Sequence, residues 1–342
     1  MKIYIIILNY NGWQDTVECL ESVFNSEYKN YQVVLVDNDS PNNSMKYIIN
    51  WAEGKQEVDY DANSKLKHLS QPFEPKPLDY VYYTKEEALN GGNKEKESKF
   101  NNPMIFIQAG ENRGFAAGNN IGLKYMLKKD DYDAVWLLNP DTLILPDTLT
   151  KLVAYAQKKP SDVGIIGTAL LYHHAPETLQ ALGGGFNPCF ATGRHILGHS
   201  PYTQETLEKF KLEDVDMIIG ASMLIRREVL KKVGLLEEDY FLYFEEIDYA
   251  LRAKKEGYHL GIEPDAIVYH KEGASINNNA SQFSDFYAMR NRLLVTSKLQ
   301  PWYIPTVVLG LLLSSLIRLR RREYTKSWMI IKILFTKRTL AH

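Results

Sequence analysis

The chain has 342 residues, more than a minimal domain needs, which predicts one large core with an appended segment. Hydrophobic residues make up 45% and charged residues 24%, a composition that excludes an intrinsically disordered chain. The formal net charge of −2 gives no sign of a nucleic-acid partner. The two cysteines, Cys19 and Cys189, form neither a metal-binding nor a disulfide pattern, so a reducing compartment such as the cytoplasm fits best.

Up to about residue 170, short apolar runs alternate with segments of helical periodicity. The first run, within MKIYIIILNYNGW, is short and lacks a small-residue cleavage site, so we interpret it as a buried strand and not as a signal peptide. Strands and helices in alternation predict an α/β fold with a mostly parallel central sheet flanked by helices. The predicted strands are KIYIIIL, YQVVLVDN, PMIFIQ, AVWLLNPD and DVGIIGT.

Three later segments depart from this alternation. Residues 53–102 are polar and indicate an insertion, which we interpret as a lid, a partner surface or a solvated excursion. LGGGFNPCFATGRH is typical of a glycine-rich loop, and VDMIIGASMLIRREVLKKVG of a strand followed by a helix. EGYHLGIEPDAIVYH predicts two strand-like pieces, the second ending at His270.

The C-terminal segment has its own charge pattern. Leu299–Ile317 contains no charged residue, although two prolines interrupt its start, and from Arg318 onwards eight basic residues accompany one acidic residue. One interpretation is a buried helix. The basic cluster favours the other, a helical tail over residues 299–342 that associates with the anionic inner face of the cell membrane. Residues 1–298 would then form the main domain.

Polar side chains follow four of the predicted strands. In open α/β sheets, ligands bind at the carboxyl ends of the strands. We therefore expect a site along one edge of the sheet, lined by Asn9, Tyr10, Asn11, Asp37, Asn38, Asp39, Glu111, Asn112, Arg113, Asn139 and Asp141.

Two nucleotide-binding motifs are missing from the sequence. No G-x-G-x-x-G follows the first strand and no G-x-x-x-x-G-K-[ST] occurs, which argues against a dinucleotide dehydrogenase and a P-loop NTPase. A bound diphosphate would need a metal ion or basic side chains instead. Asp141 is the candidate ligand, since Mg²⁺ and Mn²⁺ prefer oxygen donors. On spacing alone, NPDT is equally compatible with a turn in which Asn139 and Asp141 bind backbone amides.

Six motifs appear in the order seen in family 2 glycosyltransferases: IIILNYNG, VVLVDNDS, NRGFAAGNNIG, WLLNPD, GASMLIRREV and FLYFEEIDYALRAKKEGY. Residues 1–50 and 103–298 resemble in particular the rhamnosyltransferase-like and galactofuranosyltransferase-like members that build bacterial surface polysaccharides. The resemblance implies a GT-A fold and an inverting transfer of sugar from a nucleotide-diphosphate donor. It also implies Mg²⁺ or Mn²⁺ as the cofactor.

The resemblance also assigns roles to residues of the donor site. Asp37 would read the nucleotide base, Tyr10 and Asn11 would lie along the nucleoside, and the diphosphate side would be bordered by Asn112, Arg113 and Asn119. Asp141 fills the last position of the D-x-D metal motif, whose first position holds the neutral Asn139. His270 matches a histidine that completes the metal site in some members, although a lone histidine at a strand end is more often structural.

An inverting transfer needs one base to take the proton of the acceptor hydroxyl. Similar enzymes place it second in an acidic pair, which here is Glu245-Glu246, so the resemblance points to Glu246. Asp248 is the alternative base, or else the partner of Arg252 four residues further along a helix. Glu245 would stabilise the helix N-terminus, an explanation that serves equally for all three acids.

The sequence thus predicts a transferase that passes sugar from a UDP- or dTDP-sugar to a saccharide or lipid-linked oligosaccharide. We expect it in the cytoplasm, peripheral to the inner face of the membrane. The rival interpretation is a catalytically silent nucleotide-sugar-binding or scaffold subunit, and a nucleotidyltransferase is disfavoured because no basic glycine-rich loop follows the first strand. Arg290-Asn291-Arg292 would approach a diphosphate or lipid-linked acceptor, or would sit on a helix that covers the sheet edge with its arginines exposed.

Overall fold

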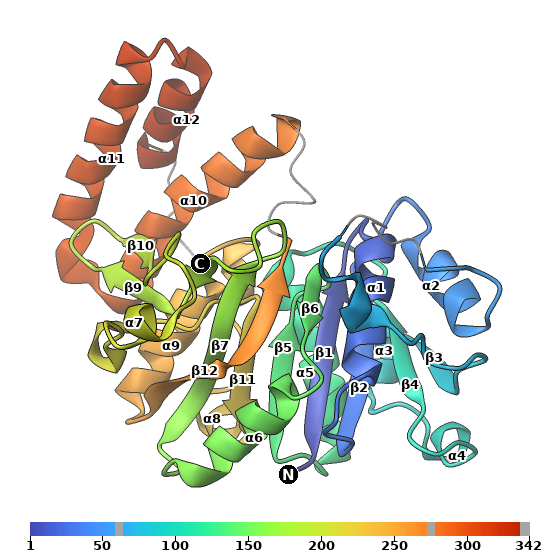
Figure 1. The fold of residues 1–342 in the computed structure, drawn as a ribbon. Coiled ribbons are helices and arrows are strands. Elements are labelled where there is room, and N and C mark those ends of the chain that lie inside the picture. Colours follow the sequence, from blue (N-terminus) through green and yellow to red (C-terminus); the bar gives the residue numbers. More distant parts are fainter. Residues whose placement is uncertain (59–63, 272–277, 336–342) are drawn as a thin grey trace.

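The computed structural model describes residues 1–58, 64–271 and 278–335, and its centre is a ten-stranded sheet (Figure 1). The strands lie in the order β3-β4-β2-β1-β5-β11-β7-β12-β6, with β8 paired to β7 beside this path. Their bounds are β1 Ile3–Asn9, β2 Tyr31–Asp37, β3 Tyr80–Thr84, β4 Met104–Gln108, β5 Ala134–Leu138, β6 Thr142–Ile144, β7 Val163–Tyr172, β8 Leu179–Ala181, β11 Ser222–Arg226 and β12 His259–His270. A separate hairpin joins β9 Gly184–Asn187 to β10 Thr192–His195.

Helices cover both faces of this sheet. Their bounds are α1 Trp13–Phe24, α2 Ser44–Ala52, α3 Lys85–Leu89, α4 Lys94–Glu97, α5 Phe115–Lys129, α6 Thr148–Lys158, α7 Gln204–Leu207, α8 Arg227–Val233, α9 Glu245–Lys255, α10 Asn278–Leu299, α11 Ile304–Arg320 and α12 Tyr324–Phe335. Because side chains alternate along a strand, Ile3, Ile5 and Ile7 pack toward α1, α2 and α6. Tyr4, Ile6 and Leu8 pack toward α5, α8 and α9.

The sheet is mostly parallel, as the alternating sequence predicts. Strands β3, β4, β2, β1 and β5 run parallel, and so do β7 and β12. The antiparallel β11 lies between β5 and β7, and β6 is antiparallel on β12. The predicted α/β fold class is therefore confirmed, and all five strands predicted in the first half are present.

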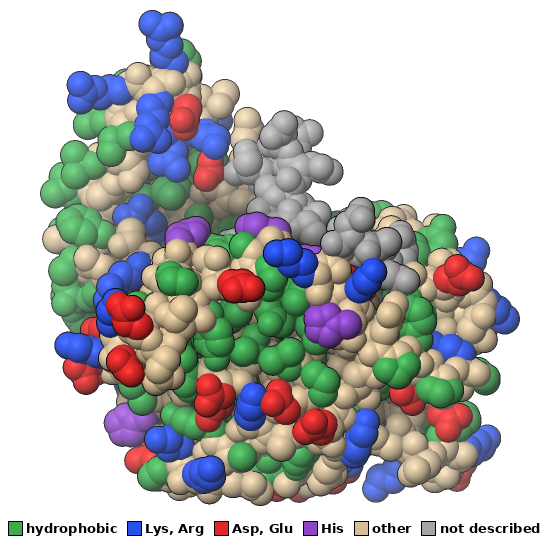
Figure 2. Space-filling view, viewed as in Figure 1, with side chains coloured by type: hydrophobic (Ala, Val, Ile, Leu, Met, Phe, Trp, Pro, Cys, Tyr) green, Lys and Arg blue, Asp and Glu red, His purple; other side chains and the backbone are tan. Residues whose placement is uncertain are grey.

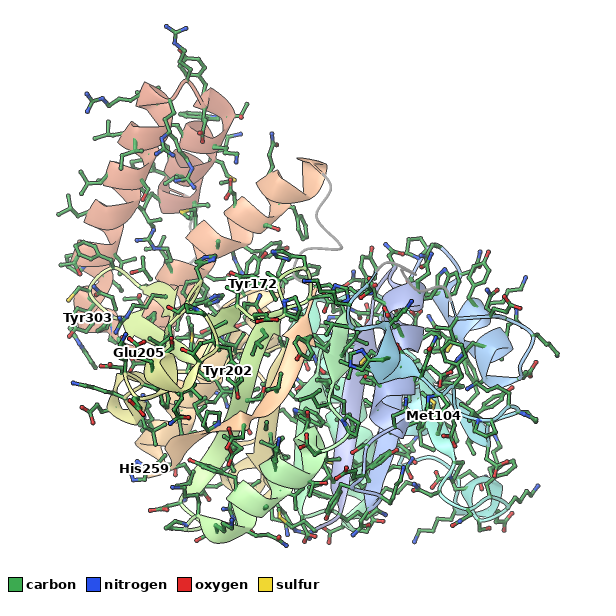
Figure 3. The ribbon with its side chains drawn as sticks, in the orientation of Figure 1. Met104, Tyr172, Tyr202, Glu205, His259 and Tyr303 are labelled. Carbon is green, nitrogen blue, oxygen red and sulfur yellow. The ribbon has the colours of Figure 1, made fainter. Side chains whose placement is uncertain are left out.

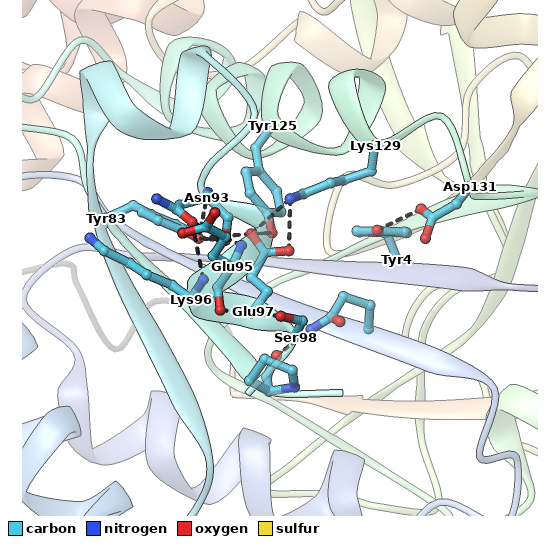
Figure 4. A network of polar contacts seen from close by, with 12 residues as sticks. Tyr4, Tyr83, Asn93, Glu95, Lys96, Glu97, Ser98, Tyr125, Lys129 and Asp131 are labelled. Atoms are coloured by element: carbon cyan, nitrogen blue, oxygen red, sulfur yellow. Dashed lines mark hydrogen bonds and ion pairs between the residues drawn. The ribbon is translucent and has the colours of Figure 1, made fainter. Parts of the chain in front are cut away.

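The predicted insertion at residues 53–102 is part of the sheet. Its β3 pairs with β4 and extends the sheet by one edge strand, although residues 59–63 lie outside the described part. Glu97 of α4 anchors the insertion to α5, since one carboxylate oxygen accepts hydrogen bonds from Tyr83 at 2.8 Å, Tyr125 at 3.0 Å and Lys129 at 2.7 Å (Figure 4). The described part of the insertion therefore widens the sheet, with α4 held on α5.

Two predictions for the middle of the chain are wrong in detail. The glycine-rich segment predicted as a loop forms the β9–β10 hairpin, closed by an Asn187 side chain that accepts from the Cys189 amide at 3.0 Å. The two strand-like pieces before His270 form one strand, β12, whose register on β7 shifts between Glu263 and Ile267. Pro264 lies in that shift, where a residue without an N–H interrupts the ladder least.

The C-terminal helices α11 and α12 form a hairpin that stands beside α10, away from the sheet (Figure 1). Val307, Leu311 and Ile330 are buried in it, whereas Leu312 and Leu316 are 38% and 55% exposed. By length and composition, Pro301–Arg320 is one helical stretch able to span a membrane, with a mean hydropathy of 1.6. Figure 2 shows hydrophobic side chains along this hairpin and Lys and Arg at its tip. Lys337 and Arg338 lie outside the described residues.

Candidate active site

The ends of β1 and β2 lie side by side, because Asn9 pairs with Asp37 in their register. Asp37 is buried and accepts hydrogen bonds from the Asn9 amide at 2.5 Å, the Ser40 amide N–H at 3.1 Å and the Ser40 hydroxyl at 2.6 Å. A carboxylate has about four lone-pair sites, so one further donor can still be accepted. The predicted grouping of these strand ends is present.

The remaining predicted nucleotide-side residues differ in exposure. Tyr10 is 41% exposed, and Asn11 has a left-handed backbone with φ of 61° and an amide bound to Ser40. Asn112 accepts from Asn38 at 2.9 Å, which ties the loop after β4 to the end of β2. Arg113 is exposed, 3.8 Å from Glu238.

Asn119 has a different setting from these loop residues. It is buried within α5, where its side-chain amide donates to the Phe115 carbonyl at 3.0 Å. That hydrogen bond lies within one helix, so the structure gives Asn119 a local partner.

Asp141 and His270 lie together at the ends of neighbouring segments. A carboxylate oxygen of Asp141 is 3.2 Å from Nε2 of His270, and Asn139 approaches the same nitrogen at 3.5 Å. The Gln180 side-chain oxygen lies 2.9 Å from Nδ1 of His270, so Nδ1 carries a proton, and a neutral ring would turn the lone pair of Nε2 toward Asp141. Two lone pairs at that distance need a proton or a cation between them.

The spacing of Asp141 and His270 suits two neighbouring ligands of an octahedral Mg²⁺ or Mn²⁺ ion. Neighbouring ligands about 2.1 Å from such an ion are about 3.0 Å apart, close to the spacing of Asp141 and His270, so the two residues fit. Burial alone would raise the pKa of Asp141, but the contact with His270 lowers it below its usual value. Within residues 1–58, 64–271 and 278–335, no group of three His, Cys, Asp or Glu side chains gathers around one metal position. The protein would supply two ligands, and the substrate phosphates the rest.

The acidic pair opens α9. Glu245 is buried, and one of its oxygens finds no hydrogen-bond donor among the described residues. Burial raises the pKa of Glu245 well above its usual value, and the neighbouring Glu246 adds to this rise. Glu246 is half-buried, and burial raises its pKa too, although backbone amides at Glu246 and Phe244 oppose the rise. A carboxylate with a raised pKa accepts a proton more readily, which suits a general base.

Asp248 has a structural setting. Asp248 is buried, and one oxygen accepts from Arg252 at 2.5 Å while the other accepts from the Tyr240 hydroxyl at 3.0 Å. Arg252 also donates to the carbonyls of Val233 and Leu235. The predicted pairing of Asp248 with Arg252 is present, and it leaves Asp248 poorly placed to act as the base.

The loop before the acidic pair has an uncommon backbone. Phe241, Tyr243 and Phe244 have φ of 65°, 67° and 78°, a region that costs a bulky residue about 1–3 kcal/mol. The same loop packs closely against Gly114, in the loop after β4 where the donor is expected. The approach is so close that a Cβ added to Gly114 would lie 2.2 Å from the Phe241 carbonyl oxygen. The loops after β4 and before α9 therefore form one packed unit.

Residues 290–292 lie on α10. Arg290 donates to the Asp239 carbonyl at 2.7 Å, and the buried Arg292 donates to the Phe190 carbonyl at the tip of the β9–β10 hairpin. The expectation of exposed arginines is therefore wrong for Arg292. Gln180 is a polar residue that the sequence did not point to, and the buried Asn291 was noted there only as part of residues 290–292. Figure 3 locates this site within the sheet. Tyr172 pairs with His270 in register and lies at the carboxyl ends of β7 and β12, whereas His259 lies at the opposite end of β12.

The fold is that of the GT-A-type glycosyltransferases. A mannosyltransferase from Pyrobaculum calidifontis, solved in complex with GDP-Man and Mn²⁺, has the same fold, with a TM-score of 0.52, 14% identity, and coverage of 98% of this chain and 88% of that one. A model of glycosyltransferase-like family 2 matches residues 101–284, and one of glycosyl transferase family 2 matches residues 4–72. The chain belongs to glycosyltransferase family 2.

Two curated relatives show what the chain is similar to. The low-salt glycan biosynthesis hexosyltransferase of Haloferax volcanii is 25% identical over 244 residues, or 68% of this chain and 70% of the relative. The N-acetylglucosaminyl-diphospho-decaprenol L-rhamnosyltransferase of Mycobacterium tuberculosis is 24% identical over 185 residues, or 50% of this chain and 57% of the relative. The recognised family, the fold and the enzyme class predicted from the sequence are therefore confirmed.

Proposed function

We propose that this glycosyltransferase inverts the anomeric centre, using Glu246 as base and a divalent metal, and transfers sugar from a UDP- or dTDP-sugar. The acidic pair at the start of α9, with Glu245 buried and Glu246 half-buried, carries the proposal, since its raised pKa values suit proton abstraction. As the acceptor oxygen attacks the anomeric carbon, its proton passes to a Glu246 carboxylate oxygen and the nucleoside diphosphate leaves from the opposite face. Asp248 is a weaker candidate because it is buried and is bound to Arg252 and Tyr240.

The donor nucleotide would lie over the ends of β1, β2 and β4. Asp37 keeps room for one more donor, which suits the ring N–H of uracil or thymine. Tyr10 and Asn11 would lie along the nucleoside, and the exposed Arg113 would approach the diphosphate. We propose Asn112 and Asn119 as supports of this region, given their hydrogen bonds within the protein.

The metal would be held by Asp141 and His270, with Gln180 fixing the imidazole through Nδ1. When bound, Mg²⁺ or Mn²⁺ offsets the charge that develops on the leaving diphosphate. Asn139 would contribute at most its amide oxygen. The Mn²⁺ in the Pyrobaculum enzyme is compatible with this assignment.

We further propose that residues 1–298 form the catalytic domain and that the tail, residues 299–342, holds it on the cytoplasmic face of the membrane. Exposed leucines of α11 and the basic residues after it provide apolar contact and attraction to anionic headgroups. A lipid-linked oligosaccharide acceptor fits this arrangement and the diphospho-decaprenol acceptor in the name of the mycobacterial relative.

A thermal-shift screen of UDP- and dTDP-sugars with and without Mn²⁺ tests the donor proposal, because a bound ligand raises the melting temperature. The best donor should release nucleoside diphosphate only when a divalent metal is present. The rival function, a silent nucleotide-sugar-binding subunit, is favoured by Asn139 and by the Glu-Glu pair, both departures from the family pattern. It predicts the thermal shift without any release.

A further inference from the structure

Asn291 connects α10 to the loop that precedes the acidic pair. Its side chain is fully buried, and its amide nitrogen lies 3.0 Å from the Tyr240 carbonyl, 2.8 Å from that of Leu242 and 2.9 Å from that of Tyr243. The amide has two hydrogens for three acceptors, so one hydrogen is shared. The side-chain oxygen of Asn291 accepts in turn from Arg290 at 3.1 Å. One side chain thus satisfies most of the carbonyls of this loop.

These carbonyls converge where the loop has a positive φ at Phe241 and Tyr243, and Phe244 at the start of α9 has a positive φ as well. Without a donor at the point of convergence, three buried or partly buried oxygens would be left without a partner, and the loop would relax toward commoner φ values. Such a change would rotate the start of α9, where Glu245 and Glu246 lie.

We propose that Asn291 is a positioning residue for the transfer reaction: its amide fixes the 240–243 loop and thereby the placement of the Glu245–Glu246 pair. This inference rests on the proposed assignment of the base to that pair. Asn291 acts through the backbone, at a distance from the substrate. A base misplaced by about 1 Å costs about 100-fold in rate, so loss of the Asn291 hydrogen bonds should lower kcat strongly.

The alternative is a purely structural role, in which Asn291 stabilises the fold without placing the acidic pair. Thr296 provides the matched control, because it is buried on the same helix and its hydroxyl donates only to the Arg292 carbonyl within that helix. Thr296→Val removes a buried hydrogen bond of α10 without touching the loop. A purely structural role predicts that variants at Asn291 and Thr296 behave alike once folded.

The experiment uses the full chain and the nucleotide sugar that gives the largest thermal shift with Mn²⁺. Water serves as the acceptor, and the nucleoside diphosphate that this hydrolysis releases is measured. Asn291→Asp keeps the shape but loses the donors, and kcat should fall about 100-fold while the donor KM changes less than about threefold. Asn291→Ser keeps one donor and should lose about tenfold, which provides a second variant if Asn291→Asp fails to fold. Thr296→Val should keep the wild-type kcat.

Hydrogen–deuterium exchange gives a readout that a general loss of stability would not produce. In Asn291→Ser, faster exchange should be confined to residues 240–246, with β1 and β5 unchanged. Wild-type kcat and exchange in both Asn291 variants, while Glu246→Gln is inactive, would overturn this inference and leave the proposed base standing. Full activity of Glu246→Gln would instead overturn the proposed base, and this inference with it.

Discussion

The backbone amide of Phe115 donates a 2.8 Å hydrogen bond to the carbonyl oxygen of Phe241. This contact joins the start of α5, on the donor side of the site, to the loop that presents the acidic pair. Gly114 makes the contact possible, since its φ of 92° and its missing Cβ let the two backbones approach. Under the proposed assignment, donor binding and proton abstraction would therefore depend on one interface between two loops.

Gly114→Ala should disrupt this interface. The added Cβ would lie 2.2 Å from the Phe241 oxygen, and the loops must separate, so we expect a loss of nucleoside diphosphate release of about 100-fold or more. Gly110→Ala is the matched control, because Gly110 also has a positive φ of 75° but no atom within 4 Å of the added Cβ. That control should lose about 1–2 kcal/mol of stability from backbone strain and keep its kcat. Equal kcat losses in both variants would contradict the interface.

Glu245→Gln should stabilise the protein at neutral and alkaline pH. Burial raises the folded pKa of Glu245 above its unfolded value, so the folded state favours the protonated form. The free energy of unfolding of the wild type should therefore fall as pH rises from about 4.3 through the folded pKa. Glutamine carries no charge and removes this fall, with a gain of about 1 kcal/mol or more above that range.

Urea unfolding across this pH range measures the effect. Glu213→Gln offers a control, because it makes the same substitution at an exposed position. A Glu245→Gln protein that is less stable than the wild type at alkaline pH would show that Glu245 has a stabilising partner when ionised.

The metal proposal predicts graded losses of Mn²⁺ binding. His270→Ala and Asp141→Ala should abolish the thermal shift that Mn²⁺ adds to UDP, because each removes a ligand. Gln180→Leu should weaken Mn²⁺ affinity by about 10- to 100-fold, since it frees the imidazole that Gln180 orients. Asn139→Ala should have the smallest effect of the four. An unchanged Mn²⁺ titration in Asp141→Ala would place the metal elsewhere.

The tail should bind vesicles that contain anionic lipid. Changing Leu312 and Leu316 together to Glu places charge on the exposed face of α11 and should lower the bound fraction at least about tenfold in co-sedimentation. Leu212→Glu, on a surface outside the tail and 41% exposed, should not. Point substitutions are preferable to deletion, because α11 and α12 also pack on α10. If the double variant binds as well as the wild type, α11 is not the membrane contact.

The grouping of strand ends was predictable because β1 and β2 are continuous apolar runs, and parallel strands bring their carboxyl ends to one edge. The hydrogen bonds from Asn291 to the 240–243 loop were not predictable, since Asn291 lies 48 to 51 residues from the carbonyls it binds. Gln180 likewise lies 90 residues from His270. The hairpin at Gly184–His195 escaped prediction because its glycines carry no alternating pattern. Asn and Gln in these positions resemble ordinary surface residues until the tertiary structure supplies their partners.

The most direct test of the account is the rate of nucleoside diphosphate release by Glu246→Gln, measured with the best donor and Mn²⁺ beside Asp248→Asn. We expect Glu246→Gln to lose about 10²- to 10⁴-fold in kcat while keeping the thermal shift with donor, because only proton abstraction is removed. Asp248→Asn should chiefly lower the melting temperature, since it weakens the contacts with Arg252 and Tyr240. Wild-type turnover by Glu246→Gln, with the loss found instead in a stably folded Asp248→Asn, would contradict the assignment and move the base to Asp248.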